Sequence, residues 1–146
     1  MMAAVQRESA RALEGDRAAT FLLGEGTVRE GGDGPVVTLA EYQGRWLLLM
    51  LGITRVIDRQ SLGVSIWGSA DGIDWHSEPL LSLPRKYYCG SYETLLNLPN
   101  RPDVKYLRAN WTVSRWAQDD RKPIFTFYIS MRELARRDES LRRPPD

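Results

Sequence analysis

The stretch that decides the fold runs from Ser61 to Trp75 and reads SLGVSIWGSADGIDW. In its first half, the apolar residues Leu62, Val64 and Ile66 alternate with small or polar residues. An alternation with a period of two is typical of a β-strand that buries one face. The second half is polar, and Trp75 then begins a new apolar segment. The stretch therefore predicts a strand, a tight turn and a returning aromatic residue, as in a β-sandwich.

The polar half of this stretch has the chemistry of a turn. Its turn-forming residues are Ser69, Asp71, Gly72 and Asp74. Serine and aspartate side chains accept hydrogen bonds from the backbone N–H groups just ahead, and glycine adopts a positive φ at little cost. Asp71 and Asp74 could also offer oxygens to Ca²⁺ or form a catalytic carboxylate pair. The alternating carboxylates of a calcium loop are absent, and the sequence shows neither the cleft nor the raised pKa that a glycosidase pair needs. We therefore assign both aspartates to the turn and expect no metal site.

Strand-like segments lie on both sides of this stretch. They are Thr20–Leu23, Val36–Tyr42, Arg45–Ile53, Glu78–Leu83, Lys86–Tyr92, Thr94–Leu98, Val104–Arg115 and Ile124–Met131. The segment Arg45–Ile53 is apolar on both faces, which predicts a central strand covered twice. The segment Val104–Arg115 alternates, which predicts a half-buried strand. About eight short strands separated by turn signals predict an all-β, jelly-roll-like antiparallel β-sandwich.

The two ends of the chain differ from this β pattern. Residues 1–19 contain small apolar residues and good helix formers, and Gly15 would end a helix there, so we expect a short helix or an unordered extension. An isolated helix of this length is marginal in water, so it either frays or docks on a partner. Ser130 and Glu133 match the capping box that begins a helix. The predicted organisation is an N-terminal extension (1–19), a β-sandwich domain (20–131) and a helical tail (132–146).

The length, net charge and apolar runs of the chain argue against several classes of function. A length of 146 residues suits one domain with a real core. The 20 basic and 19 acidic residues leave a net charge of +1, so we expect neither nucleic acid nor a membrane as partner. The longest apolar run, Trp46–Leu51, is far shorter than the roughly 20 residues of a membrane span. The first 20 residues have no apolar core, so we expect no signal peptide and a cytoplasmic location.

The residue types that most often perform catalysis are scarce. His76 and Cys89 are the only histidine and cysteine, so a nucleophilic pair would have to use both. Cys89 lies in a predicted strand, where we expect a buried and inert thiol. One histidine and one cysteine also leave a zinc site two ligands short. We expect no enzyme and no cofactor.

The aromatic residues are the more informative candidates. Trp46 and Trp111 fall on core-facing positions of predicted strands, so we expect them to pack in the core. The candidates for a contact surface lie at or near strand ends: Trp67, Trp75, Trp116, Tyr87 and Tyr88. Exposed rings at such places can stack on sugars or enter a pocket on a partner protein, whereas tryptophan is more often mostly buried. Both interpretations remain open at this point.

Two motifs resemble a known family. The segment Ile66–Trp75 resembles the strand–turn signature S-x-D-G-x-x-W of discoidin-type, galactose-binding-like β-sandwiches, and Val104–Val113 resembles a later strand of the same domains. With FTFYIS at Phe125–Ser130, the pair also looks like small β-sandwich proteins of phage and prophage structural clusters. The matching positions are Ser69, Asp71, Gly72 and Trp75 in the turn and Tyr106, Leu107 and Arg108 in the strand. The resemblance implies a β-sandwich, and a place inside a phage-like particle as an alternative to the cytoplasm.

These observations predict a non-catalytic protein that works through protein–protein contact. It would self-associate or serve as an accessory part of a phage-like or other intracellular assembly. The alternative is a carbohydrate-binding module that uses its loop aromatic residues, with a glycan as ligand.

Overall fold

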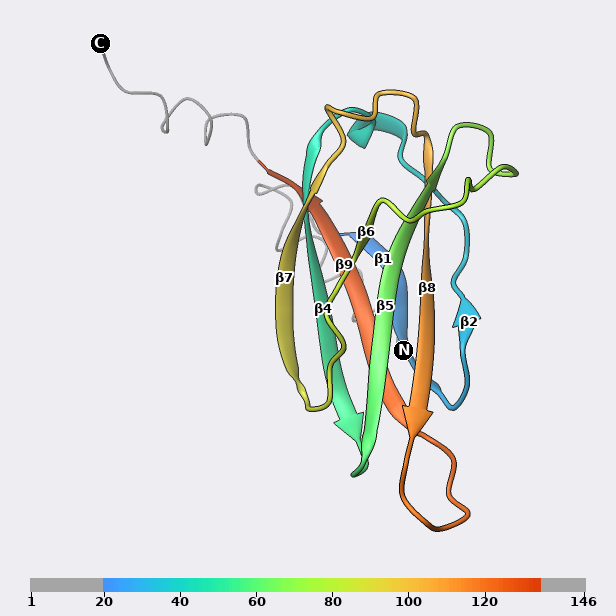
Figure 1. Ribbon diagram of the computed structural model, residues 1–146. Coiled ribbons are helices and arrows are strands. Elements are labelled where there is room, and N and C mark those ends of the chain that lie inside the picture. The colour runs from blue at the N-terminus through green and yellow to red at the C-terminus, as the bar shows by residue number, and fades with distance from the viewer. Residues whose placement is uncertain (1–19, 135–146) are drawn as a thin grey trace, which may run out of the picture.

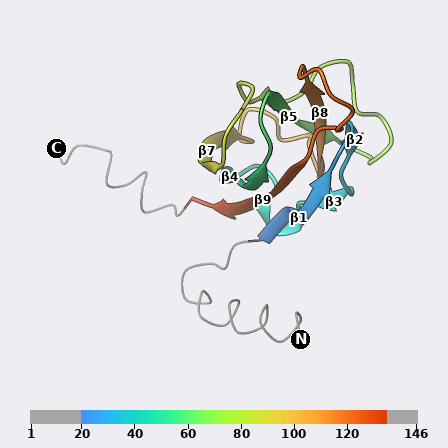
Figure 2. The ribbon, with the colours of Figure 1, turned by 90° about the horizontal axis from the view of Figure 1, so that it is seen from below.

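The computed structural model describes residues 20–134, which form two antiparallel β-sheets packed face to face (Figure 1). The all-β sandwich predicted from the sequence is confirmed. The extension predicted for residues 1–19 and the tail after residue 134 lie outside the described residues. Figure 2 shows the two sheets as separate layers, with β7, β4, β9 and β1 in one and β5, β8 and β2 in the other.

Each sheet is built around two long neighbouring strands. The first sheet has the order β1 (Thr20–Val28), β9 (Phe125–Glu133), β4 (Trp46–Val56) and β7 (Gly90–Asn97). The second sheet has the order β2 (Gly32–Asp33), β8 (Tyr106–Arg115), β5 (Gln60–Ser69) and β6 (Leu81–Ser82), and β3 (Val37–Thr38) also pairs with β8. A 3₁₀ turn, η2 (Ala40–Tyr42), precedes β4.

The connections between strands agree with the predicted jelly-roll-like arrangement. The short strands β2 and β3 pair with the same strand β8 and act as one interrupted strand, so the nine strands of residues 20–134 correspond to about eight. Counted in this way, every consecutive pair of strands except β5 and β6 lies in opposite sheets. Such repeated crossing from sheet to sheet is typical of a double Greek key.

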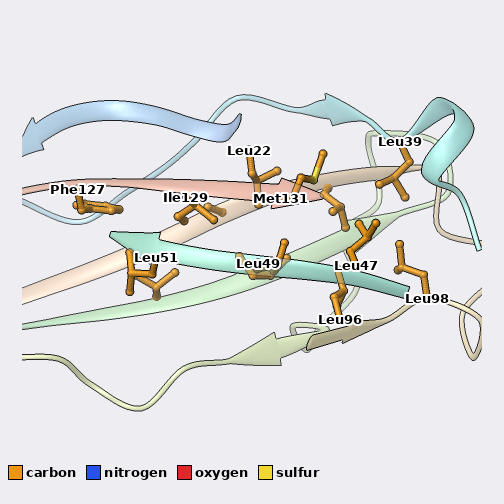
Figure 3. Close-up of a cluster of buried hydrophobic side chains, with 14 of the residues drawn as sticks. Leu22, Leu39, Leu47, Leu49, Leu51, Leu96, Leu98, Phe127, Ile129 and Met131 are labelled. Atoms are coloured by element: carbon orange, nitrogen blue, oxygen red, sulfur yellow. The ribbon is translucent and has the colours of Figure 1, made fainter. Parts of the chain in front are cut away.

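The core lies between the sheets and is lined by alternate residues of each long strand. Leu62, Val64 and Ile66 of β5 are buried, as their alternation predicts. Figure 3 shows side chains that β1, β4, β7 and β9 contribute, together with Leu39 and Leu98 from the neighbouring loops. Those labelled there are Leu22, Leu39, Leu47, Leu49, Leu51, Leu96, Leu98, Phe127, Ile129 and Met131. Most of the opposite positions of β5 and β8 are small or polar, with Trp67 and Tyr106 as the large exceptions, so the second sheet largely follows the usual alternation of antiparallel sheets.

The expectation that β4 is covered on both faces is wrong. Leu47, Leu49 and Leu51 are buried between the sheets, whereas Trp46, Leu48 and Met50 on the other face are only half-buried. Trp46 therefore points away from the core, contrary to its predicted position. The apolar run reflects one face that packs in the core and a second face that no other part of residues 20–134 covers fully.

The helix predicted to begin at Ser130 is also wrong. Strand β9 continues to Glu133, because β4 pairs with it as far as Leu47 opposite Glu133. Arg45 Nη1 also donates to Glu133 Oε2 over 2.8 Å. Backbone pairing with a central strand outweighs the local capping-box pattern. The sandwich thus extends past the predicted boundary at residue 131.

Three predicted strands are shorter or displaced. The segment 78–83 contributes only β6, and 36–42 contributes β3 followed by the 3₁₀ turn. Within 86–92, Lys86 forms an isolated bridge with Leu62, and the next strand begins only at Gly90. Tyr87, Tyr88 and Cys89 therefore lie in a loop. Cys89 is exposed there, which corrects the expectation of a buried thiol.

Candidate functional site

Three of the predicted contact residues, Tyr87, Tyr88 and Trp116, come together in one place. Tyr87 and Trp116 meet edge to face with ring centroids 6.2 Å apart, and Tyr87 and Tyr88 are 6.3 Å apart. Their exposed fractions are 45%, 75% and 56% for Tyr87, Tyr88 and Trp116. We call these three residues the aromatic cluster. It lies at the end of the sandwich where β5 begins and β8 ends, opposite the end where β9 finishes (Figure 1).

Backbone hydrogen bonds hold both halves of the aromatic cluster. The Lys86 N–H donates to the Leu62 carbonyl and the Leu62 N–H donates to the Lys86 carbonyl, each over 2.9 Å. These bonds fix the residue before Tyr87 to the edge of β5. The Trp116 N–H donates to the Arg59 carbonyl over 2.9 Å, which fixes the tryptophan just past the end of β8. The rings therefore stand on backbone that the sandwich positions.

Tyr92 fastens the tyrosine loop from the side of β7. Its hydroxyl donates to the Tyr88 carbonyl over 3.1 Å, and the Lys86 ammonium lies 4.2 Å from the centre of its ring. A cation over an aromatic face contributes about 0.5–1 kcal/mol at an exposed site. The loop that carries Tyr87 and Tyr88 is thus tied at both ends.

A network of charged residues secures the loop that follows Trp116. Arg115 is the centre of this network, and its side chain is only 3% exposed. Its guanidinium donates to both carboxylate oxygens of Asp119, to the Asp58 carbonyl over 3.2 Å and to Asp58 Oδ1 over 3.1 Å. The hydrogen bonds from Arg115, with one from the Arg121 N–H, hold the pKa of Asp119 far below its ordinary value. The network joins the β8–β9 loop to the β4–β5 turn beside the aromatic cluster.

The lowered pKa of Asp119 predicts a loss of stability in acid. A carboxyl group whose pKa is depressed by folding stabilises the folded state above its unfolded pKa of about 4, and this contribution fades as the pH falls further. We expect Asp119→Asn to melt at a lower temperature than the wild type at neutral pH. The difference should shrink on acidification, because the wild type then loses the same interaction. Thermal melts across the acidic range measure both effects.

Asp120→Asn is the matched control for this measurement, because it removes the same charge from the same loop without touching the Arg115 contacts. A gap between Asp119→Asn and the wild type that stayed constant with pH would contradict the assignment.

The other two predicted contact residues, Trp67 and Trp75, lie on the outer face of the second sheet. Trp67 Nε1 donates to Ser65 Oγ over 2.9 Å. The ring of Trp75 covers the guanidinium of Arg108, whose central carbon lies 4.6 Å from the ring centre. Both tryptophans are half-buried. They are separate from the aromatic cluster, and Trp75 engages an intramolecular cation.

The polar residues after β5 bond mainly to their own backbone. Asp71 Oδ1 accepts from the Ile73 N–H over 2.8 Å and from the Asp74 N–H over 2.9 Å. Ser69 Oγ accepts from the Gly72 N–H over 2.8 Å, and Gly72 adopts a φ of 80°. The donated backbone bonds, with one from the Ser69 hydroxyl, lower the pKa of Asp71. Asp74 Oδ1 accepts from the His76 N–H over 3.0 Å. This geometry is that of a turn stabilised by its side chains.

The described residues hold little that would support metal chemistry. Among residues 20–134, no group of three or more histidine, cysteine, aspartate or glutamate side chains could hold a metal ion. Within the same range, the structure has no helix of the length and hydropathy that spanning a membrane requires.

Comparison with known proteins gives only remote likenesses. No protein-family model and no curated protein matches the chain. Among solved structures, it is similar to the K3 cleaved adhesin domain of Lys-gingipain from Porphyromonas gingivalis W83, with 15% identity, a TM-score of 0.44 and coverage of 80% of this chain and 72% of that one. The K1 cleaved adhesin domain of the same protein gives 12% identity, a TM-score of 0.43 and coverage of 81% and 73%. The structure of infectious bursal disease virus Gt strain gives 9% identity and a TM-score of 0.44, with coverage of 77% of this chain and 30% of that one.

At such low identities and TM-scores, these likenesses carry no inference about activity or partner. The assignment to the β-sandwich class rests on the two sheets of the chain itself. The resemblance to discoidin-type domains in particular stays a prediction.

Proposed function

We propose that this chain is a non-catalytic β-sandwich that works through protein–protein contact, with the aromatic cluster as its contact surface. The observation that carries the proposal is the exposure of three touching rings, Tyr87, Tyr88 and Trp116, on fixed backbone. Tyrosine and tryptophan are enriched among the residues that dominate binding energy at protein interfaces. Adjacent exposed rings therefore provide the apolar centre that such an interface needs.

The surroundings of the aromatic cluster support the same proposal. An interface combines an apolar centre with a polar rim, and charged side chains here lie along the loops that hold the rings. Asp58, Arg59 and Arg121 are exposed by 62%, 62% and 58%. Because the Arg115 network and Tyr92 already order these loops, docking would cost little additional loop entropy. The site is preorganised for contact.

The finer assignment follows the resemblance of Ile66–Trp75, Val104–Val113 and Phe125–Ser130, taken together, to phage and prophage structural proteins. The chain would act as a homo-oligomer or as an accessory part of a phage-like or other intracellular assembly, in the cytoplasm or within the particle.

Self-association is tested with the full chain by native mass spectrometry and light scattering over a range of concentrations. In the double variant Tyr88→Ser/Trp116→Ser, we expect association to weaken by roughly 30-fold or more, since a loss of about 2 kcal/mol marks a dominant interface residue. Trp75→Ala is the matched control, because it removes an aromatic ring away from the aromatic cluster and should leave association unchanged. A wild type that stays monomeric and captures no partner in a pull-down would overturn the proposal.

A second candidate function uses the same rings to bind a carbohydrate. The observation that favours it is the exposure of Tyr88 and Trp116 beside polar loop residues, since exposed aromatic faces can stack on sugar rings. A glycan array, followed by tryptophan fluorescence titration of any hit, tests it. Trp116→Ser should abolish binding to such a hit, and silence across a broad array would exclude this candidate.

A further inference from the structure

The strand β7 forms one edge of the first sheet (Figure 1). It pairs with β4 in one unbroken register, from Gly90 opposite Ile53 to Asn97 opposite Trp46. No strand of residues 20–134 pairs with its other side. Alternate residues of an edge strand direct their backbone N–H and C=O groups away from the sheet, where a further strand can bind them. We call this open side of Gly90–Asn97 the β7 edge.

The β7 edge lacks the features by which proteins usually protect an edge. Those features are very short strands, bulges, proline and charged residues, lysine above all. The sequence of β7, GSYETLLN, contains no proline and no basic residue, and its single charged residue is Glu93. Its pairing with β4 has no register shift. The strand is therefore a regular and open template for a partner strand.

The other sheet edges within residues 20–134 are protected. In the second sheet, the outer strands β2, β3 and β6 have two residues each. In the first sheet, register shifts interrupt the pairing of β1 with β9, between Phe21 and Leu23 and between Leu23 and Gly26. Short strands and irregular pairing both discourage the addition of a further strand. The contrast within one molecule identifies the β7 edge as an interaction surface.

A second copy of the chain fits the β7 edge. A two-fold axis perpendicular to the sheet makes two copies of β7 antiparallel, and it keeps their outward residues on the same face of the joined sheet. The same strand then supplies both halves of the contact. The two four-stranded sheets would join into one sheet of eight strands, which is within the usual size of an open sheet.

The side chains of β7 favour one register for this pairing. If Glu93 were at the centre, it would lie opposite Glu93 of the second copy, and like charges directly opposite each other are destabilising. If Leu95 were at the centre, only residues 93–97 of the two strands would overlap. Centring on Thr94 avoids the charge repulsion and pairs residues 91–97 of both copies. The Thr94-centred register therefore combines the longer overlap with compatible side chains.

We propose that two copies of the chain pair through their β7 edges in antiparallel orientation, with Thr94 opposite Thr94 of the second copy. In this arrangement, Tyr92 lies opposite Leu96 of the second copy, and Glu93 lies opposite Leu95. A threonine pair across two strands is favourable, and Tyr92 with Leu96 adds an apolar pair. Backbone hydrogen bonds between the two strands supply the rest of the contact, as in other cases of strand addition.

This inference rests on the proposed self-association of the chain and names a second contact that takes part in it. The aromatic cluster borders the start of the β7 edge, because Tyr88 lies just before β7 and the Tyr92 hydroxyl donates to the Tyr88 carbonyl over 3.1 Å. The rings would therefore extend the interface that the paired strands form.

Disulfide formation in the full chain tests the pairing. In a Cys89→Ser background, Thr94→Cys gives each copy a single thiol that lies opposite the same thiol of the other copy. Residues directly opposite in an antiparallel pair have Cα atoms about 4.5–5.5 Å apart, which a disulfide can bridge. Mild oxidation should therefore convert most of the protein into a covalent dimer on non-reducing electrophoresis.

Ser91→Cys in the same background is the matched control, because it places the thiol on the same strand but away from the two-fold axis. Ser91 would lie opposite Asn97 of the second copy, so the two introduced thiols would be about 20 Å apart. This variant should stay monomeric after oxidation. Equal cross-linking of the two variants would contradict the proposal.

Native mass spectrometry of the same proteins separates this inference from the proposed function. A chain that associates while the Thr94→Cys thiol stays reduced would overturn the β7 pairing and leave the proposed self-association standing. A cross-linked Thr94→Cys dimer, with association unaffected by Tyr88→Ser/Trp116→Ser, would support the β7 pairing and overturn the role of the aromatic cluster. A wild type that stays monomeric would overturn both.

A second measurement tests the register through charge. Leu95→Lys places an ammonium group opposite Glu93 of the second copy, whereas Leu95→Glu places a carboxylate there. Both variants remove the same leucine, so the difference between their dissociation constants reports the charge. We expect the Kd of the Leu95→Glu dimer to be roughly tenfold higher at low salt, and the difference to shrink as salt screens the charges. Equal dissociation constants would overturn the Thr94-centred pairing.

Discussion

Replacing Phe127 with alanine should lower the free energy of unfolding by about 3–5 kcal/mol, the usual cost of truncating a buried phenylalanine. Phe127 lies in β9, in the middle of the core, and is 1% exposed. Its ring meets Trp111 of β8 edge to face with centroids 5.8 Å apart, so it connects the two sheets. The truncation removes both the buried area and this ring contact, and it leaves a cavity that the flanking strands cannot close.

Urea unfolding followed by circular dichroism measures this loss. Phe127→Leu is the matched control, since it keeps an apolar side chain of similar volume and should cost roughly 1.5 kcal/mol or less. A loss for Phe127→Ala no greater than that of the leucine variant would show that the two sheets are not packed through this ring.

Replacing Gln60 with leucine should cost about 2–3 kcal/mol, because two backbone groups would lose their partners. Gln60 begins β5 and is 1% exposed. Its Nε2 donates to the Ile124 carbonyl over 2.6 Å, and its Oε1 accepts from the Ile124 N–H over 2.8 Å. The side chain thus replaces a backbone partner for Ile124, just before β9, and joins the second sheet to the first. Leucine matches the size of the side chain but restores neither bond.

The variant Gln60→Glu separates hydrogen bonding from packing. A neutral glutamic acid can donate to the Ile124 carbonyl and accept from its N–H, whereas the carboxylate can only accept. We therefore expect the pKa of the introduced group to rise on folding, so that the variant is stabilised in acid and loses stability as the pH rises. Chemical denaturation at several pH values measures this trend, and a Gln60→Leu profile with the same pH dependence would contradict it.

The architecture of the sandwich could be predicted because a strand with one buried face alternates apolar and polar residues along its sequence. The inward residues of β5, such as Leu62 and Val64, and those of β9, such as Phe127, occupy the faces that their spacing indicates. Burying one face of a strand requires an apolar residue at every second position, so the alternation in the sequence directly indicates which face is buried. The polar turn after β5 is similarly local, since Ser69 and Asp71 bond to backbone within a few residues.

The errors arise where distant residues decide the outcome. Ser130 and Glu133 carry a helix-start pattern, but pairing with β4 keeps them in a strand. Trp46 lies in an apolar run whose two faces look alike in sequence, and only the position of the second sheet decides which face is the core. The aromatic cluster joins Tyr87 and Trp116, which are far apart along the chain, so the sequence could name its members but not their contact. Arg115 and Asp58 meet for the same reason, through the proximity of two loops.

The position of β9 has a consequence for how the protein is made. This strand lies between β1 and β4, so the first strand of the described chain and the last are neighbours. During synthesis from the N-terminus, β1 has no partner in its sheet until the segment from Phe125 onwards has left the ribosome. Contacts of such long sequence separation form slowly. The nascent chain must therefore carry an unpaired β1 and a half-paired β4 until β9 has been synthesised.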